Sequence, residues 1–94
     1  MKYRKMPVVI EAVQWKGNNL SEIEQELDAK HTVVETIGRG GLPTGCLTVY
    51  TLEGPLSAQR FDWIIKGVKG ECYPCKPDVF MLTYDLVADV GGRK

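Results

Sequence analysis

Three cysteines and one histidine are the side chains in this sequence best suited to chemistry. Cys72 and Cys75 form a Cys-x-x-Cys pair, the spacing of redox dithiols, in which a nearby positive charge stabilises the attacking thiolate. Lys76 follows the pair directly and supplies such a charge. The known redox dithiol, however, follows the first strand of a parallel βαβ unit, whereas this pair comes late in a chain that shows no parallel crossover. The pattern therefore favours a structural role for the pair over redox catalysis.

A second interpretation of the same cysteines is a metal site. Four side chains of the type that tetrahedral zinc prefers are present, namely His31, Cys46, Cys72 and Cys75. Only one Cys-x-x-Cys knuckle occurs, and it contains Pro74, which lacks the backbone N–H that a knuckle uses to hold a thiolate. Isolated cysteines in strands behave as small apolar residues. We therefore expect no metal and no cofactor, with this set of four as the lesser alternative.

Basic and aromatic residues alternate in the segment 60–76, a mixture that suits phosphate binding or stacking on bases. Acidic residues within the same segment dilute its positive field, and buried aromatics beside solvated turn lysines would produce the same pattern. We take eight residues from it as candidate contacts for a ligand or a partner: Arg60, Trp63, Lys66, Lys69, Glu71, Tyr73, Cys75 and Lys76. No residue is assigned a catalytic role.

The glycine-rich segment Gly38–Gly45 superficially resembles a phosphate-binding loop. A dinucleotide fingerprint requires its glycines between a strand and a helix, and the residues after Gly45 favour a strand instead. The segment is better interpreted as a hairpin connection, whose length and single Arg39 make it a candidate contact loop. His31 follows a predicted helix, so a capping or surface position is expected for it.

Length, charge and cysteine count limit the classes of protein to which these residues can belong. The chain has 94 residues with 12 basic and 12 acidic side chains, which fits one domain of zero formal net charge. Zero net charge argues against binding nucleic acid through bulk positive charge. No apolar run approaches the roughly 18 residues that cross a bilayer, so no membrane association is expected. Three cysteines are too few for a disulfide scaffold, which makes a reducing cytoplasm the expected compartment.

Hydrophobic patterning predicts an α+β single domain over residues 1–94, with a curved, mostly antiparallel sheet of about five or six short strands. Residues 8–15 are apolar on both faces and predict a central strand. An amphipathic helix is expected at about 19–30, with Asn19 and Glu22 forming a capping box. Further strands are predicted at 32–37, 46–52, 56–59, 61–66 and 71–75. A short helical turn that begins at 76–78, an edge strand at 84–88 and a frayed tail at 90–94 are expected to follow.

Four segments of the chain carry a family resemblance: Tyr3–Trp15, Thr51–Gly54, Asp62–Glu71 and Tyr73–Phe80. They resemble a family of small bacteriophage and prophage proteins whose members carry no assigned activity. The second half also shows a weaker similarity to phage proteins of the Pro-Gly-Asp-Tyr-Gly type. The resemblance implies a shared fold and a phage origin.

Two positions depart from that family. The family has glycine where Phe61 stands, so a tight turn would lose its preferred residue, and we expect a continuous strand or a differently shaped corner. The family has an aromatic residue where Cys72 stands, which further weakens the redox and zinc interpretations. Cys75 matches the family pattern.

Taken together, these features predict a phage- or prophage-derived accessory protein that acts by binding, without catalysis, with antagonism of host defence as one such role. The expected partner is a host protein, or a small anionic ligand held between Arg39 or Arg60 and the lysines near Tyr73. One alternative is a homo-oligomeric structural component, because a small sheet with open edges can pair with a second copy. Another is a thiol-dependent enzyme that uses Cys75 with assistance from Lys76 and Glu71.

Overall fold

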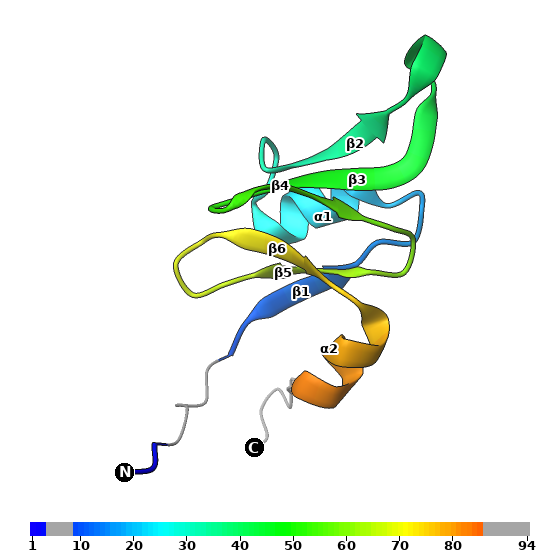
Figure 1. The fold of residues 1–94 in the computed structure, drawn as a ribbon. Helices are drawn as coiled ribbons and strands as arrows, with labels where there is room; N and C mark the ends of the chain where they lie inside the picture. Colours follow the sequence, from blue (N-terminus) through cyan, green and yellow to red (C-terminus); the bar gives the residue numbers. More distant parts are fainter. Residues whose placement is uncertain (4–8, 86–94) are drawn as a thin grey trace.

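A computed structural model describes residues 1–3 and 9–85 of the chain. Within these residues six strands form two antiparallel sheets, ordered β1-β5-β6 and β2-β3-β4, and two α-helices accompany them (Figure 1). The predicted α+β fold with short, antiparallel strands is confirmed, but the strands form two three-stranded sheets instead of the single curved sheet predicted. The elements are β1 (Glu11–Gln14), α1 (Leu20–Leu27), β2 (Val33–Ile37), a 3-10 turn (Arg39–Gly41), β3 (Pro43–Thr51), β4 (Gly54–Ala58), β5 (Trp63–Lys66), β6 (Cys72–Cys75) and α2 (Pro77–Thr83).

The core lies where α1 and the two sheets meet. α1 packs against β1, β2 and β5, while β6 packs against β3 and β4. Ile23 and Leu27, one helical turn apart, are the buried face of α1. The helix ends at Leu27, earlier than predicted, because Asp28 adopts a left-handed conformation with φ 50°. The other large core residues are Trp15, Val33, Leu47, Val49, Ile64 and Cys72.

Asn19 occupies the predicted N-cap position of α1, but the predicted capping box is wrong. Its side chain caps no backbone N–H of the helix. Instead, its amide nitrogen donates to the carbonyl of Gln14 at 2.8 Å and to the carboxylate of Glu22 at 2.9 Å. Its amide oxygen accepts the N–H of Lys16 at 2.8 Å. Asn19 therefore connects the end of β1 to the start of α1.

The prediction of a central strand over 8–15 is wrong, because β1 is short and lies at the edge of its sheet. Residues 4–8 lie outside the described residues. Val13 packs against the core, while Ala12 lies on the opposite face, beside Trp63 and α2. Trp15 follows the strand and is buried, and its indole N–H donates to the carbonyl of Gly45 at 2.9 Å. The apolar residues on the two faces thus have different surroundings, the core on one side and a groove toward α2 on the other, and do not require a central position.

A tight corner precedes β5, so the prediction of a strand that begins at Phe61 is wrong. Phe61 has φ 77°, and the turn is closed by the N–H of Asp62, which donates to the carbonyl of Gln59 at 3.0 Å. A positive φ at the third position is the signature of a type II turn. Trp15 donates to the carbonyl of Asp62 and accepts from the N–H of Phe61, so two residues oppose one in a β-bulge. Phe61 thus occupies the conformation that glycine favours.

The C-terminal part is more helical than predicted. Pro77 begins α2 at the first helical position, and the helix continues to Thr83 instead of ending after one turn. Tyr84 follows in an extended conformation, and neither Tyr84 nor Asp85 belongs to a strand. The rest of the predicted strand 84–88, residues 86–88, lies outside the described residues, as does the predicted tail at 90–94. Neither α1 nor α2, the helices found among the described residues, has the length and apolar character to cross a bilayer.

Two predicted loops are partly strand. Pro43–Gly45 belong to β3, and the tip of the β2–β3 hairpin is the 3-10 turn that carries Arg39, which protrudes from the body of the molecule (Figure 1). Gly54 and Pro55 belong to β4, whereas the sequence suggested a turn. Proline is tolerated there because β4 is an edge strand.

Candidate functional site

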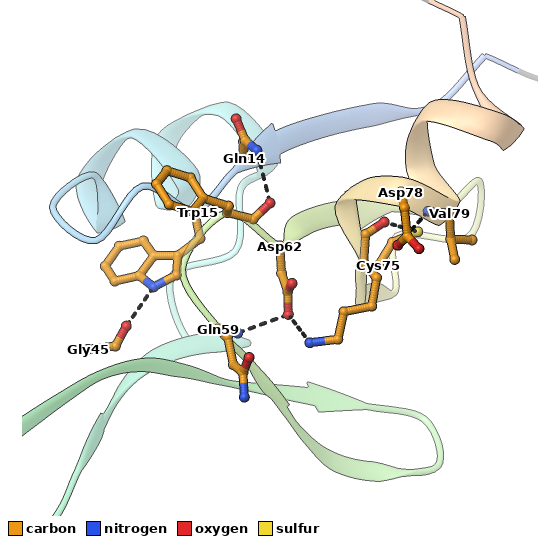
Figure 2. A network of polar contacts seen from close by, with 10 residues as sticks. Gln14, Trp15, Gly45, Gln59, Asp62, Cys75, Asp78 and Val79 are labelled. Atoms are coloured by element: carbon orange, nitrogen blue, oxygen red, sulfur yellow. Dashed lines mark hydrogen bonds and ion pairs between the residues drawn. The ribbon is translucent and has the colours of Figure 1, made fainter.

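The buried carboxylate of Asp62 organises the corner between β5 and α2. Asp62 is 3% exposed, and its Oδ2 accepts the backbone N–H of Gln59 at 2.9 Å and the ammonium of Lys76 at 3.0 Å. Lys76 is the residue immediately before α2, so the ion pair ties the start of the helix to the start of β5 (Figure 2). A buried charge requires such partners. Lys76, a predicted contact residue, therefore has a structural partner.

Cys75 lies beside this corner as a protonated thiol. Its Sγ contacts the carbonyl of Lys76 at 3.6 Å, and the side chain is half-buried (Figure 2). Burial raises the pKa of the Cys75 thiol, and the neighbouring carboxylates of Asp62 and Asp78 raise it further. A thiol with a raised pKa is mostly protonated at neutral pH and is a weak nucleophile. The environment of Cys75 is thus the reverse of the one that activates a catalytic cysteine.

The Cys-x-x-Cys pair points to two sides of its strand. Cys72 and Cys75 are three residues apart on β6, and successive side chains of a strand alternate between faces. Cys72 is buried in the core, and that burial raises its pKa. Among residues 1–3 and 9–85, which include His31 and Cys46, no group of three or more His, Cys, Asp or Glu side chains is placed to hold a metal ion.

The predicted basic contacts lie in separate places. The guanidinium of Arg60 lies against Gly17, so close that a Cβ at that glycine would be 2.7 Å from Arg60 Nε. Lys66 ends β5 at the hairpin turn, and the backbone N–H of Lys69 within that turn donates to the carboxylate of Glu71 at 3.1 Å. Arg60, Lys76 and the hairpin lysines therefore do not form one cationic pocket within the described residues.

An aromatic stack lies where β5 meets α2. The rings of Trp63 and Phe80 are 4.1 Å apart between centroids and within 4° of parallel, and Tyr84 continues the stack at 5.1 Å from Phe80. Beside the stack is an open groove of about 450 Å³ between β1 and α2. Its lining residues are Ile10, Ala12, Trp63, Phe80, Met81, Tyr84 and Asp85.

A second hollow of about 240 Å³ lies on the α1 side of β1. Ala12 and Trp63 line both hollows, so the two adjoin at these residues. The second is lined by Ala12, Val13, Gln14, Lys16, Glu22, Glu26 and Trp63. We call the two together the β1 groove, with an aromatic half beside α2 and an acidic half beside α1.

α2 adds exposed apolar surface to the aromatic half. The helix lies entirely within the described residues and has no buried residue. Val79 is 50% exposed, Met81 73% and Leu82 89%. Of these three, Met81 lines the groove and adds exposed apolar surface there, whereas Val79 and Leu82 do not line it. The apolar run after Pro77 is the sequence signal for it, but the predicted single helical turn gave no reason to pair Phe80 with Trp63.

A third hollow of about 360 Å³ lies between the β3–β4 turn and β6. Its lining includes Glu53, Glu71 and Tyr73, together with the apolar Leu52 and Leu56. Burial, followed by the neighbouring Tyr84 hydroxyl, raises the pKa of Tyr73 to about 12. Two carboxylates and a neutral phenol do not suit an anion.

No protein-family model, curated protein or solved structure matches the chain. The interpretation of the site therefore rests on the geometry described above. That geometry defines a small α+β domain with an aromatic groove beside an edge strand.

Proposed function

We propose that this chain is a binding module that recognises a protein partner through the β1 groove and performs no catalysis. One observation carries the proposal. The Trp63–Phe80 stack borders an open groove, although two large aromatic rings would be better shielded from water within the core. Aromatic residues in a concave surface are the usual anchors of protein interfaces.

A protein partner is favoured over a small anionic ligand because the basic residues are already engaged or dispersed. Lys76 pairs with Asp62, and Arg60 packs on Gly17. Arg39 lies at the hairpin tip. By contrast, the β1 groove is apolar along α2 and includes the exposed Met81.

The resemblance of the sequence to small phage and prophage proteins supplies a biological setting for the proposal. In that setting the partner is a host protein in the bacterial cytoplasm, and binding would antagonise host defence or regulation. A thiol-dependent enzyme is the weaker proposal, because the pKa of Cys75 is raised. A homo-oligomer would use the same apolar surface and is an outcome of the test below.

Selection from a random peptide library against the immobilised protein tests the proposal. We expect the selected peptides to lose about tenfold or more in affinity on Met81→Glu, which puts a charge in the aromatic half. Leu82→Glu is the matched control, because Leu82 is exposed on the same helix but does not line the groove. Equal losses for both variants, or no selected peptide at all, would contradict the proposal. Dimerisation that Met81→Glu abolishes would assign the groove to a second copy.

A further inference from the structure

The backbone of β1 has one open edge. Trp15 exchanges backbone hydrogen bonds with the corner at Phe61 and Asp62, so its N–H and carbonyl face β5. Backbone groups alternate in direction along an antiparallel strand, so those of Val13 face β5 as well, and those of Ala12 and Gln14 face away. The carbonyl of Gln14 accepts from Asn19.

Three backbone groups remain on this edge: the N–H and the carbonyl of Ala12, and the N–H of Gln14. Among the described residues β1 pairs only with β5, so these groups have no strand partner there. Unpaired edge groups of this kind are the template on which an extended peptide can add as a further strand. The β1 groove runs along this same edge, because Ala12 lines both of its halves.

The two halves present different chemistry to the two faces of an added strand. On the α2 face lie the aromatic stack and Met81. On the α1 face lie Glu22 and Glu26 with a single basic residue, Lys16, so this half is acidic on balance. The carboxylate of Glu22 is held in place by the side-chain amide of Asn19 at 2.9 Å.

We propose that the β1 groove binds an extended peptide in which apolar side chains alternate with lysine or arginine. The peptide adds to β1 as a strand, with its apolar residues against Trp63 and Met81 and its basic residues toward Glu22 and Glu26. Successive side chains of a strand point to opposite faces, so one alternating sequence satisfies both halves. This inference rests on the proposed function and specifies the partner.

Charge complementarity favours such a peptide over a second copy of the chain. In a pairing of two edges, the second copy would present its own β1, which contains Glu11 and no basic residue. That strand would lie beside Glu22 and Glu26, where like charges repel. A foreign segment with basic residues has the opposite, attractive interaction.

Amide hydrogen exchange with a synthetic peptide of alternating valine and lysine tests the inference. We expect the peptide to slow exchange at Ala12 and Gln14 by about tenfold or more, while the amide of Val13 is already slow without it. N-methylation of the valines alone, and of the lysines alone, gives two further probes. In an added strand only every second residue points its backbone N–H and carbonyl toward β1. Methylation of those N–H groups should abolish binding, whereas methylation of the others should not, so one probe should fail and the other should bind. Binding of both, or of neither, would overturn strand addition.

Charge variants test the acidic half. Glu22→Gln combined with Glu26→Gln should weaken the valine–lysine peptide by about threefold to tenfold, and a valine–glutamate peptide should not bind. Glu24→Gln is the control, since Glu24 lies on the same helix but outside the groove. Equal effects of the double variant and the control would overturn the charge assignment.

The two proposals can fail separately. If library-selected peptides depend on Met81 but leave the amides of Ala12 and Gln14 unprotected, strand addition is wrong and the proposed function stands. If neither the selected peptides nor the valine–lysine peptide binds, the proposed function is wrong. If the two amides become protected with protein concentration alone, as the mass doubles, the edge belongs to a second copy and the peptide proposal is overturned.

Discussion

The ammonium of Lys76 lies 3.0 Å from the buried carboxylate of Asp62. This contact joins the start of α2 to the start of β5, and Phe80, one turn into the helix, stacks on Trp63 of the same strand. The aromatic half of the β1 groove thus has an ion pair at its end. We therefore expect the arrangement of the aromatic half to depend on Asp62 and Lys76, although neither residue lines the groove.

Removal of this ion pair should destabilise the fold. Lys76→Met leaves Asp62 buried with one backbone N–H donor and no counter-charge. Because Lys76 is 56% exposed, water can partly take the place of its ammonium beside Asp62 in the variant. We therefore expect a loss of about 1–2 kcal/mol in the free energy of unfolding. Urea denaturation measures it. Lys69→Met, at the exposed hairpin turn, should change stability by less than about 0.5 kcal/mol, and an equal loss would contradict the role of Lys76.

Glycine at position 61 should stabilise the protein. Phe61 has φ 77°, a conformation that costs a residue with a Cβ about 1–2 kcal/mol. Phe61→Gly removes this strain but adds about 0.5–1 kcal/mol of freedom to the unfolded chain, so the net gain should be about 0.5–1 kcal/mol. Thermal unfolding measures the gain. Phe61→Ala keeps the strained conformation and should give none; a gain from alanine as large as that from glycine would refute the strain argument.

Tyr73 should make the fold sensitive to alkali. Its pKa is raised to about 12 in the folded protein, above the value of about 10 for an unfolded chain. The folded state therefore holds the phenolic proton more tightly, and this contribution is complete below pH 10 and lost as the pH rises toward 12. Stability should fall over this range in the wild type and fall less in Tyr73→Phe. Identical alkaline unfolding curves for the two proteins would exclude this role for Tyr73.

The Cys75 thiol should resist alkylation in the folded state. Burial and the nearby Asp62 and Asp78 raise its pKa, so less thiolate is present at a given pH than in the unfolded chain. The sign for stability is the same as for Tyr73: the contribution is present at neutral pH and is lost as the pH rises through the folded pKa. Iodoacetamide labelling, resolved by mass spectrometry, should be slower in native protein than in urea. Faster native labelling would instead revive the thiol-dependent enzyme.

Local hydrophobic patterning predicts most of the helices and strands, but it does not predict which elements pack against one another. Ile23 and Leu27 place the buried face of α1, and alternation in 46–52 places β3. The edge position of β1 does not follow from the pattern, because an apolar residue such as Ala12 on its second face lines the open groove toward α2. The sequence also gave no sign that Asp62 is buried, since its partner Lys76 is fourteen residues away.

The candidate site was predicted only in part. Trp63 was identified as a contact candidate, but its partner Phe80 was not, since their contact depends on the register between β5, β6 and α2. The basic residues were grouped by closeness in sequence. Lys66 lies at the turn of the β5–β6 hairpin, whereas Lys76 follows the opposite end of β6, so the two do not share one binding site.

The order of the strands has a consequence for how the chain acquires its structure. β1 pairs with β5, and the whole β2-β3-β4 sheet lies between them in sequence, so Val13 meets Ile64 across about fifty residues. On the ribosome, β1 must wait until β5 has emerged, whereas β2, β3 and β4 can pair as successive hairpins. Such non-local pairing slows folding, because a long loop closes before its contacts form. We therefore expect β1, whose free edge is the proposed peptide-binding edge, to be among the last parts of the molecule to fold.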